Sequence, residues 1–481
     1  MKSRYLPLLL ALLCAQAYAQ TPGPVNTLAA TLANAPSALD NYYGPYCTAT
    51  HAYALVNTRK DGKGREDMGL VYDLSGGTTA KVQAVSIPWQ KNRNNLSAFG
   101  VFQGQPFVVY DQYDMGTNIS QLTLQRYASK SFEADGEPVS MGDLVFHEKS
   151  VFVDQVKFEV AQSPDGSKLL LSTVLNIKHE ATVLCWVFDE RFELAWSGSY
   201  GLGTFGYEMF NEVKVADTGD VLFASLGIVL TDDLYSLDKA GEKKVNVLAA
   251  NTRHRDVLFH RFRGGTEQHW NGKLPDGRQL IDGSMTMNAN GVFAAGVLEA
   301  EKGASERNWV VVELDEALHP VAVVAEGPGA KETRDRNYDT RLQVASDGSM
   351  LFLYAHERLG SVALHPDGVM KWTSSSTLGR TPDVYSTGTE FFAGKALSVK
   401  DMDDIAADRS LGENYDQRPV LIRWDGAGKV NFTPVIPFAH PVKKGAYYVK
   451  RPQFHNVQAC GQYVDWDNER RPTLYQVAMD L

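Results

Sequence analysis

Short runs of apolar residues, interrupted by Gly, Asp and Asn, extend along most of the chain, and one arrangement of them recurs. An apolar, β-rich run ends in Asp and is followed by a second short run of the same kind. The copies follow one another at an average spacing of about 58 residues. They end at Asp73, Asp189, Asp238, Asp315, Asp367, Asp425 and Asp480, with a weaker copy over 124–136.

A second element, a hairpin with a tight turn, lies between these copies. The clearest turns contain Asp165-Gly166 and Asp347-Gly348, and similar ones fall at 217–219 and 288–291. Gly accepts the positive φ that tight hairpin turns need, and Asp and Asn tolerate it. Val, Leu and Phe residues flank the turns and predict strands. Each repeat therefore holds two hairpins, or four short strands.

Repeated four-stranded units of this length predict the blades of a β-propeller. Each four-stranded sheet has two apolar faces, and stacking the sheets around an axis buries both. A β-sandwich would show no fixed period, and the coils of a β-solenoid are shorter. We therefore expect an all-β protein, a single propeller of seven or eight four-stranded blades. Helix is expected only at 26–39. Because the chain ends just after a third strand, we expect an N-terminal strand to join the C-terminal strands and close the ring.

The N-terminus has the pattern of a signal peptide. Lys2 and Arg4 precede an apolar run over 6–13, and Ala17-Tyr18-Ala19 provides a cleavage pattern. The run is too short to span a bilayer, which needs about 20 residues. We therefore expect export to the periplasm or the exterior. The predicted parts are a signal peptide at 1–19, a lead segment at 20–40 and the propeller domain at 41–481.

Composition and charge narrow the class of protein. The 481 residues include 47 Lys and Arg against 57 Asp and Glu, a net charge of −10, which becomes −12 once Lys2 and Arg4 leave with the signal peptide. An acidic chain argues against a nucleic-acid partner, and an apolar fraction of 44% argues against disorder. We expect a monomer without a membrane-spanning segment.

The cysteines differ in their surroundings. Cys14 leaves with the signal peptide, and Cys185 lies in the apolar run 183–188, where it is predicted to be buried. Cys47 and Cys460 lie near opposite ends of the mature chain. Ring closure would bring these ends together, so a Cys47–Cys460 disulfide is a hypothesis that depends on the closure.

Two segments resemble known propellers. The sequence Ser-Pro-Asp-Gly-Ser-Lys-Leu at 163–169 resembles the repeats of TolB-like and dipeptidyl-peptidase-type propellers. The segment 187–196 resembles a strand pair of exported propeller proteins from uncharacterised bacterial families. The resemblance implies blade construction over most of 40–481 and leaves function open. No nucleophile elbow or peptidase domain is evident, so the peptidase activity is not expected here.

The segment 251–278 interrupts the repeat and is basic and aromatic in an acidic chain. Guanidinium groups bind carboxylates, and aromatic faces stack on sugars, so this segment is a candidate site for an anionic or carbohydrate ligand. The alternative is a solvated long loop. Its His residues lack metal-ligand spacing, and no metal site is predicted. The candidate ligand-binding residues are Arg253, His254, Arg255, His260, Arg261, Arg263 and Trp270.

Two other segments are weaker candidates. The acidic segment 401–416 suggests calcium, but Ile405 and Ala406 do not fit a calcium loop, and a solvated acidic loop is expected. The segment 201–206 matches GxGxxG, but no helix pattern follows it, so no dinucleotide site is predicted. The sequence identifies no catalytic residue and no cofactor.

Two functional hypotheses follow. The first is an exported, non-catalytic propeller that binds a glycan, a peptide or an envelope partner through loops on one face. The alternative is a carbohydrate-active enzyme, a lyase or glycosidase with its site at the mouth of the central channel. The lack of a recognisable catalytic constellation favours the first hypothesis, and the basic segment motivates the second.

Overall fold

The fold was obtained as a computed structural model. It describes residues 26–31, 39–48, 50–60, 64–73, 81–85, 87, 96–114, 116–145, 158–177, 180–210, 213–231, 234–237, 243–245, 256–288, 291–299, 306–331, 339–355, 358–387, 390–411, 417–434, 453–455, 458–466 and 472–480.

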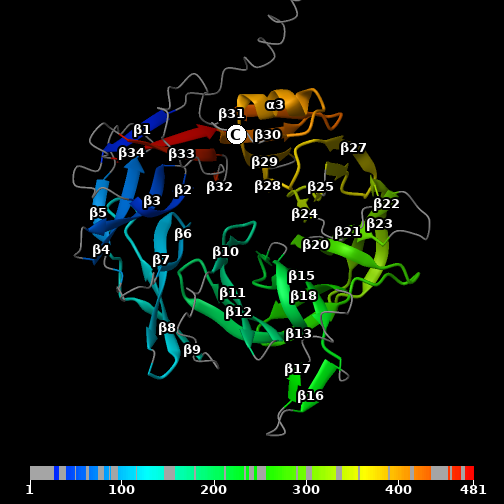
Figure 1. Ribbon diagram of the computed structural model, residues 1–481, viewed down its shortest axis with the longest axis horizontal. Coiled ribbons are helices and arrows are strands. Elements are labelled where there is room, and N and C mark those ends of the chain that lie inside the picture. The colour runs from blue at the N-terminus through cyan, green and yellow to red at the C-terminus, as the bar shows by residue number, and fades with distance from the viewer. Residues whose placement is uncertain are drawn as a thin grey trace, which may run out of the picture.

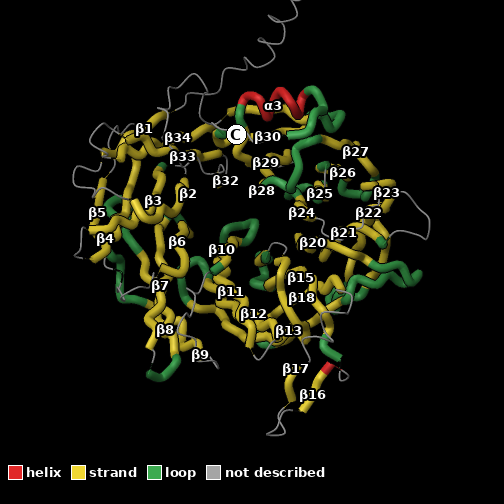
Figure 2. The backbone as a smooth tube through the Cα atoms, viewed as in Figure 1, coloured by secondary structure: helices red, strands yellow, loops and turns green. Residues whose placement is uncertain are grey.

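The described chain consists almost entirely of antiparallel β-sheets (Figure 1, Figure 2). Most sheets have four strands, and consecutive sheets follow one another around a common centre in Figure 1. This is the arrangement of β-propeller blades. The prediction of an all-β propeller is confirmed.

Five of the sheets take their strands in chain order. The first holds β2 (Leu39–Cys47), β3 (His51–Lys60), β4 (Gly64–Asp73) and β5 (Lys81–Val85). The second holds β6 (Leu96–Phe102), β7 (Gln105–Asp114), β8 (Ile119–Arg126) and β9 (Val139–Val145). Further along are β20 (Leu280–Asn288), β21 (Gly291–Leu298), β22 (Glu306–Leu314) and β23 (Pro320–Lys331). Next come β24 (Asp339–Val344), β25 (Met350–Ala355), β26 (Leu359–Leu364) and β27 (Met370–Ser376). The last of the five holds β28 (Asp383–Thr387), β29 (Glu390–Leu397), β30 (Arg418–Trp424) and β31 (Val430–Pro434).

An eight-stranded sheet lies between β9 and β20 and contains two four-stranded sets. Its strands are β10 (Glu159–Gln162), β11 (Leu169–Ile177), β12 (Glu180–Phe188), β13 (Leu194–Phe210), β14 (Lys214–Val215), β15 (Val221–Val229), β18 (Asp256–Arg263) and β19 (Thr266–Trp270). A separate hairpin joins β15 to β18 and consists of β16 (Tyr235–Leu237) and β17 (Lys243–Val245). The copy of the repeat assigned to Asp238 is therefore wrong, because β16 belongs to this hairpin, and β18 is the third strand of its set.

The long strand β13 connects the two sets. Its first part pairs with β12, and its last part pairs with β15, with Phe205 opposite residues of both strands. Gly203 has a φ of 62° there, and its carbonyl accepts a hydrogen bond from the Leu230 N–H at 2.8 Å. The GxGxxG pattern is thus part of a strand that bends from one set to the next, where Gly accepts the positive φ.

Hydrogen bonds made by the recurring Asp explain the repeat. At the end of β12, Asp189 Oδ1 accepts the N–H groups of Arg191 at 2.9 Å and Glu193 at 3.0 Å. Asp315 and Asp425 accept two backbone N–H groups each in the same way. The side chain replaces backbone partners within a tight turn. In the other type of hairpin, Gly166 and Gly348 have φ angles of 71° and 88°, as the Asp-Gly pattern predicts.

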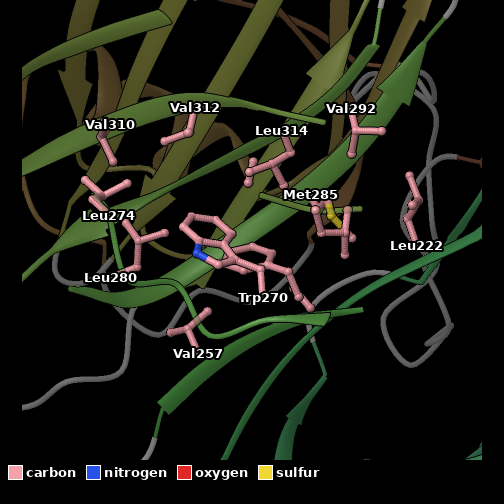
Figure 3. Packing of buried hydrophobic residues seen from close by; sticks show 14 of the residues in the cluster. Leu222, Val257, Trp270, Leu274, Leu280, Met285, Val292, Val310, Val312 and Leu314 are labelled. Atoms are coloured by element: carbon pink, nitrogen blue, oxygen red, sulfur yellow. The ribbon is translucent and has the colours of Figure 1, made fainter. Parts of the chain in front are cut away.

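Apolar side chains fill the space between consecutive sheets. One cluster joins the sheet of β20–β22 to the set of β15, β18 and β19, as Figure 3 shows. Another joins β6–β9 to β11 and β12. Burying both faces of a sheet in this way gains about 25 cal/mol for each Å² of apolar surface removed from water.

Strands from the two ends of the described chain share one sheet, in the order β1 (Asn26–Thr31), β34 (Pro472–Asp480), β33 (Gln458–Trp466) and β32 (Gln453–His455). Asn26 pairs with Ala478 and Thr31 with Thr473. The helix expected at 26–39 is therefore wrong over 26–31, and residues 32–38 lie outside the described residues. The free edge of β34 offers unpaired backbone groups, and β1 satisfies them as a strand. β2 lies beside β32 and β33. Cys47 is on β2 and Cys460 on β33, and their disulfide stays a prediction.

A helix replaces the acidic loop expected around residue 401. Helix α3 (Val399–Ala406) begins with a capping box, in which Ser398 Oγ accepts the Asp401 N–H and Asp401 accepts the Ser398 N–H. Asp404 is buried and pairs with Lys400 at 2.5 Å and with Arg409 at 2.9 Å. These carboxylates stabilise the helix, so the solvated-loop interpretation is wrong over 401–406, whereas 412–416 lie outside the described residues. In the part of the chain described, no helix is long and apolar enough to span a bilayer.

The close approach of β25 and β26 requires Gly360. A Cβ atom at this position would lie 2.1 Å from the Tyr354 ring on the paired strand. We expect Gly360→Ala to lower the free energy of unfolding by about 1–3 kcal/mol, the usual cost of overpacking. The matched control is Gly426→Ala, where nothing lies within 4 Å of the added atom. Urea unfolding measures both, and equal stabilities of the two variants would contradict the prediction.

Candidate binding site

The structure places four of the seven predicted ligand-binding residues on two paired strands. His260, Arg261 and Arg263 lie on β18, and Trp270 ends β19. β18 pairs with β15 and β19, so the loop expected at 251–278 is wrong from Asp256 to Trp270. The inserted segment lies earlier, at 230–255. Arg253, His254 and Arg255 lie outside the described residues.

Trp270 is part of the core. Only 6% of its surface is exposed, and Figure 3 shows it among Leu274, Leu280 and Val257. Its ring stacks on Phe259 with 5.0 Å between centroids, and its Nε1–H donates to the Lys273 carbonyl at 3.0 Å. The side chain is therefore satisfied within the protein and does not offer a stacking face to a ligand.

Arg261 connects its own set of strands to the neighbouring sheet of β20–β23. It is 4% exposed and ion-paired with Asp220, which is 1% exposed. Its Nε lies 2.7 Å from Asp220 Oδ2, and its Nη1 donates to the Glu316 carbonyl, in a turn of the neighbouring sheet, at 2.9 Å. A fork-shaped guanidinium suits this combination of partners. Arg261 thus stabilises the junction between two sheets.

Arg263 is the one described candidate that reaches solvent. Its side chain is 59% exposed, and its Nε lies 3.3 Å from Asp220 Oδ1. It stands at the opposite end of β18 from Asp256, about 23 Å away at 3.3 Å per residue. Of the described basic candidates on β18, Arg263 alone is therefore available to a ligand.

His260 is buried between aromatic rings. Phe223 and Phe262 flank it at centroid distances of 5.5 and 5.8 Å. Its Nδ1 lies 3.3 Å from Glu267 Oε1, and its Nε2 has no hydrogen-bond partner. Burial lowers the pKa of His260 because the imidazolium form loses its hydration, and Glu267 partly opposes this shift. Among the described residues, no group of three or more His, Cys, Asp or Glu side chains could hold a metal ion.

The connections between strands fall on two faces, which differ in character. We define the turn face by the first-to-second and third-to-fourth connections of each sheet. Turns of three consecutive sets meet there: Gln103 Nε2 donates to the Gly166 carbonyl at 2.6 Å, and the Asp165 N–H donates to Asp217 Oδ1 at 3.0 Å. The turn face is thus held by hydrogen bonds between short turns, and Arg263 lies at one of them.

The loop face is defined by the second-to-third connections and by the links from one sheet to the next. It carries the insertion 230–255, with β16 and β17, and the insertion 398–417, with α3. Figure 1 shows β16 and β17 extending outward from the ring, and α3 on the outer side of β30. Long connections on a rigid scaffold are where binding residues are usually placed. The spacing of the repeat did not reveal that the long connections share one face, because assigning a connection to a face requires knowing which strands pair.

Comparison with known proteins gives similarity to solved structures only. No family model matches, and no curated protein matches. The chain is similar to polysaccharide lyase Uly1 at 11% identity and a TM-score of 0.39, covering 82% of this chain and 94% of the lyase. It is similar to the β-propeller domain of the Trilobed protease from Pyrococcus furiosus at 8% identity and a TM-score of 0.37, covering 84% and 98%. Similarity to Pyrococcus horikoshii acylaminoacyl peptidase is at 9% identity and a TM-score of 0.37, covering 88% of this chain and 57% of the peptidase. Identities this low indicate nothing about ligand or activity.

The buried ion pair predicts unequal effects for two neighbouring arginines. Arg261→Ala leaves Asp220 buried without its main partner, and we expect the free energy of unfolding to fall by about 3–5 kcal/mol. Arg263→Ala removes an exposed group and should cost at most about 1 kcal/mol. Urea unfolding at neutral pH measures both. Equal losses of unfolding free energy in the two variants would show that Arg261 does not stabilise the junction between the sheets.

The lowered pKa of His260 predicts a loss of stability in acid. The unfolded chain binds this proton more readily than the folded protein, so the contribution is fully present above about pH 6.5 and is lost as the pH falls below that value. We expect His260→Phe, which keeps the aromatic packing, to lose less stability than the parent between about pH 6.5 and 5. His319→Gln, at an exposed position, is the control and should follow the parent. Parallel pH profiles for all three proteins would refute this assignment.

Proposed function

We propose that this protein is an exported, non-catalytic β-propeller of eight blades that binds its partner through the loop face. The partner is a glycan, a peptide or an envelope component. The blade number is supported by the five sheets in chain order, the two sets of the eight-stranded sheet, and the sheet that combines β1 with β32–β34. In the last, β1 supplies the fourth strand, which supports ring closure by the N-terminal segment.

The difference between the two faces carries the functional proposal. On the turn face, the first-to-second turns of three neighbouring sets are hydrogen-bonded to one another, and the basic residue Arg261 is ion-paired with Asp220. Within the described part of the chain, the loop face carries two insertions with their own secondary structure, β16–β17 and α3. Variation in connection length without change to the strands is typical of surfaces that bind partners. Export is inferred from the signal-peptide pattern at 1–19, which lies outside the described residues.

The test is a binding screen with the mature protein. Residues 20–481 are applied to a glycan array and to a peptide array, followed by three variants of the loop face. One replaces Tyr235–Val245 with a Gly-Ser linker, one is Val399→Glu, at an exposed position on α3, and one is Gln121→Ala, at an exposed position near the loop-face end of β8. We expect at least one of them to weaken binding about tenfold or more, equivalent to about 1.4 kcal/mol, with an unchanged unfolding temperature.

Arg263→Ala is the matched control on the turn face and should bind as the parent does. The proposal fails if neither array yields a ligand, or if binding survives all three loop-face changes. Mass spectrometry of the recovered ligand separates binding from catalysis. Cleavage of a bound glycan would overturn the non-catalytic assignment in favour of the carbohydrate-active enzyme.

A further inference from the structure

A polar cleft opens at the loop-face end of the sheet formed by β6–β9. Its volume is about 310 Å³, at the lower end of the range for small-molecule sites. The β7–β8 turn forms one side of it, through Asp114, Thr117 and Ile119. None of the residues that line the cleft was singled out by the sequence.

A row of three polar side chains on adjacent strands lines the cleft. Gln112 on β7 is paired with Gln121 on β8, and Gln121 is paired with Asp143 on β9. All three residues are exposed. Neighbouring strands lie about 4.8 Å apart, so the row is about 10 Å long. The two amides offer both donors and acceptors, and the carboxylate offers acceptors only.

The turn beside this row holds a carboxylate in a fixed position. Asp114 Oδ1 accepts the Gly116 N–H at 2.8 Å, and Oδ2 accepts the Thr117 hydroxyl at 2.9 Å. These hydrogen bonds lower the pKa of Asp114, so the group stays ionised at neutral pH. The Tyr113 hydroxyl donates to Asn118 Oδ1 at 2.5 Å within the same turn. The side of the cleft is therefore built from side chains whose orientation the turn itself determines.

The charge of the cleft restricts what it can bind. Asp114 and Asp143 are acidic, and among the described residues that line the cleft there is no Lys, Arg or His. A carboxylate or sulfate on a ligand would therefore be repelled by these two carboxylates. Hydroxyl groups, by contrast, donate to carboxylates and both donate to and accept from amides. We propose that this cleft is a binding site for a neutral carbohydrate, recognised through its hydroxyl groups by Gln112, Gln121, Asp143 and Asp114.

This inference rests on the proposed function, because the cleft lies on the loop face, and it names the ligand class. It differs from the anionic ligand that the basic segment of the sequence suggested. Arg261, the arginine buried in that segment, is bound to Asp220, whereas the cleft presents amides and carboxylates that are exposed. The ligand preference should therefore follow the exposed groups of the cleft.

Calorimetric titration tests the site with defined sugars. The mature protein is titrated with maltose, cellobiose and lactose, and with digalacturonic acid as the anionic counterpart. We expect at least one neutral disaccharide to bind and digalacturonic acid to bind at least about tenfold more weakly. Gln121→Ala and Asp143→Asn should each weaken the neutral sugar about tenfold, as expected for loss of a hydrogen bond to a charged or exposed polar group. Glu190→Gln, which removes an exposed carboxylate on the turn face, should not.

The outcomes separate this inference from the proposed function. In one outcome, neutral-sugar binding persists in Gln121→Ala and Asp143→Asn and is lost on replacing Tyr235–Val245. This result overturns the cleft as the binding site and supports the loop face as the binding surface. Equal or tighter binding of digalacturonic acid also overturns the neutral-ligand assignment. If none of the sugars binds while a peptide from the array does, the cleft inference fails and the proposed function stands. Absence of every ligand overturns both.

Discussion

The structure depends on burying two apolar faces of every four-stranded sheet. No sheet can achieve this alone, and each hydrophobic cluster accordingly draws side chains from two consecutive sheets. Pairing also joins distant parts of the described chain, because β1 and β34 share one sheet although they are far apart in sequence. The long strand β13 links two sets directly, because its first part pairs with β12 and its last part with β15.

The same constraint determines which side chains remain for function. Strand residues face a neighbouring sheet, so polar groups on them are consumed by internal contacts. Asp111, fully buried on β7, accepts hydrogen bonds from Ser97 and Ser120 on the flanking strands. Arg261 is used in the same way at a junction between sheets. The exposed polar side chains of the candidate cleft, by contrast, lie near strand ends and in a connection on the loop face.

Sequence alone predicted the parts of the fold that depend on local chemistry. An Asp that accepts backbone N–H groups and a Gly with positive φ are needed wherever a tight turn occurs, so they recur with the repeat. The errors arose where tertiary pairing overrides local pattern. Residues 26–31 have a helical pattern but complete a sheet, and Asp238 follows a strand of an inserted hairpin that looks like a blade strand. The capping box of α3 was visible as Ser398 and Asp401, but the acidic composition concealed it.

The candidate site was harder to predict than the fold, because charge along a sequence is not charge on a surface. Arg278 is paired with Asp276 and Glu326, and Arg409 with Asp404, so these basic residues neutralise local carboxylates. Conversely, Gln112, Gln121 and Asp143 are far apart in sequence and become neighbours only through strand register. A shift of the register by one residue would turn each of them to the opposite face of the sheet. Ligand recognition at this cleft is therefore a property of the pairing of β7, β8 and β9, which no local motif encodes.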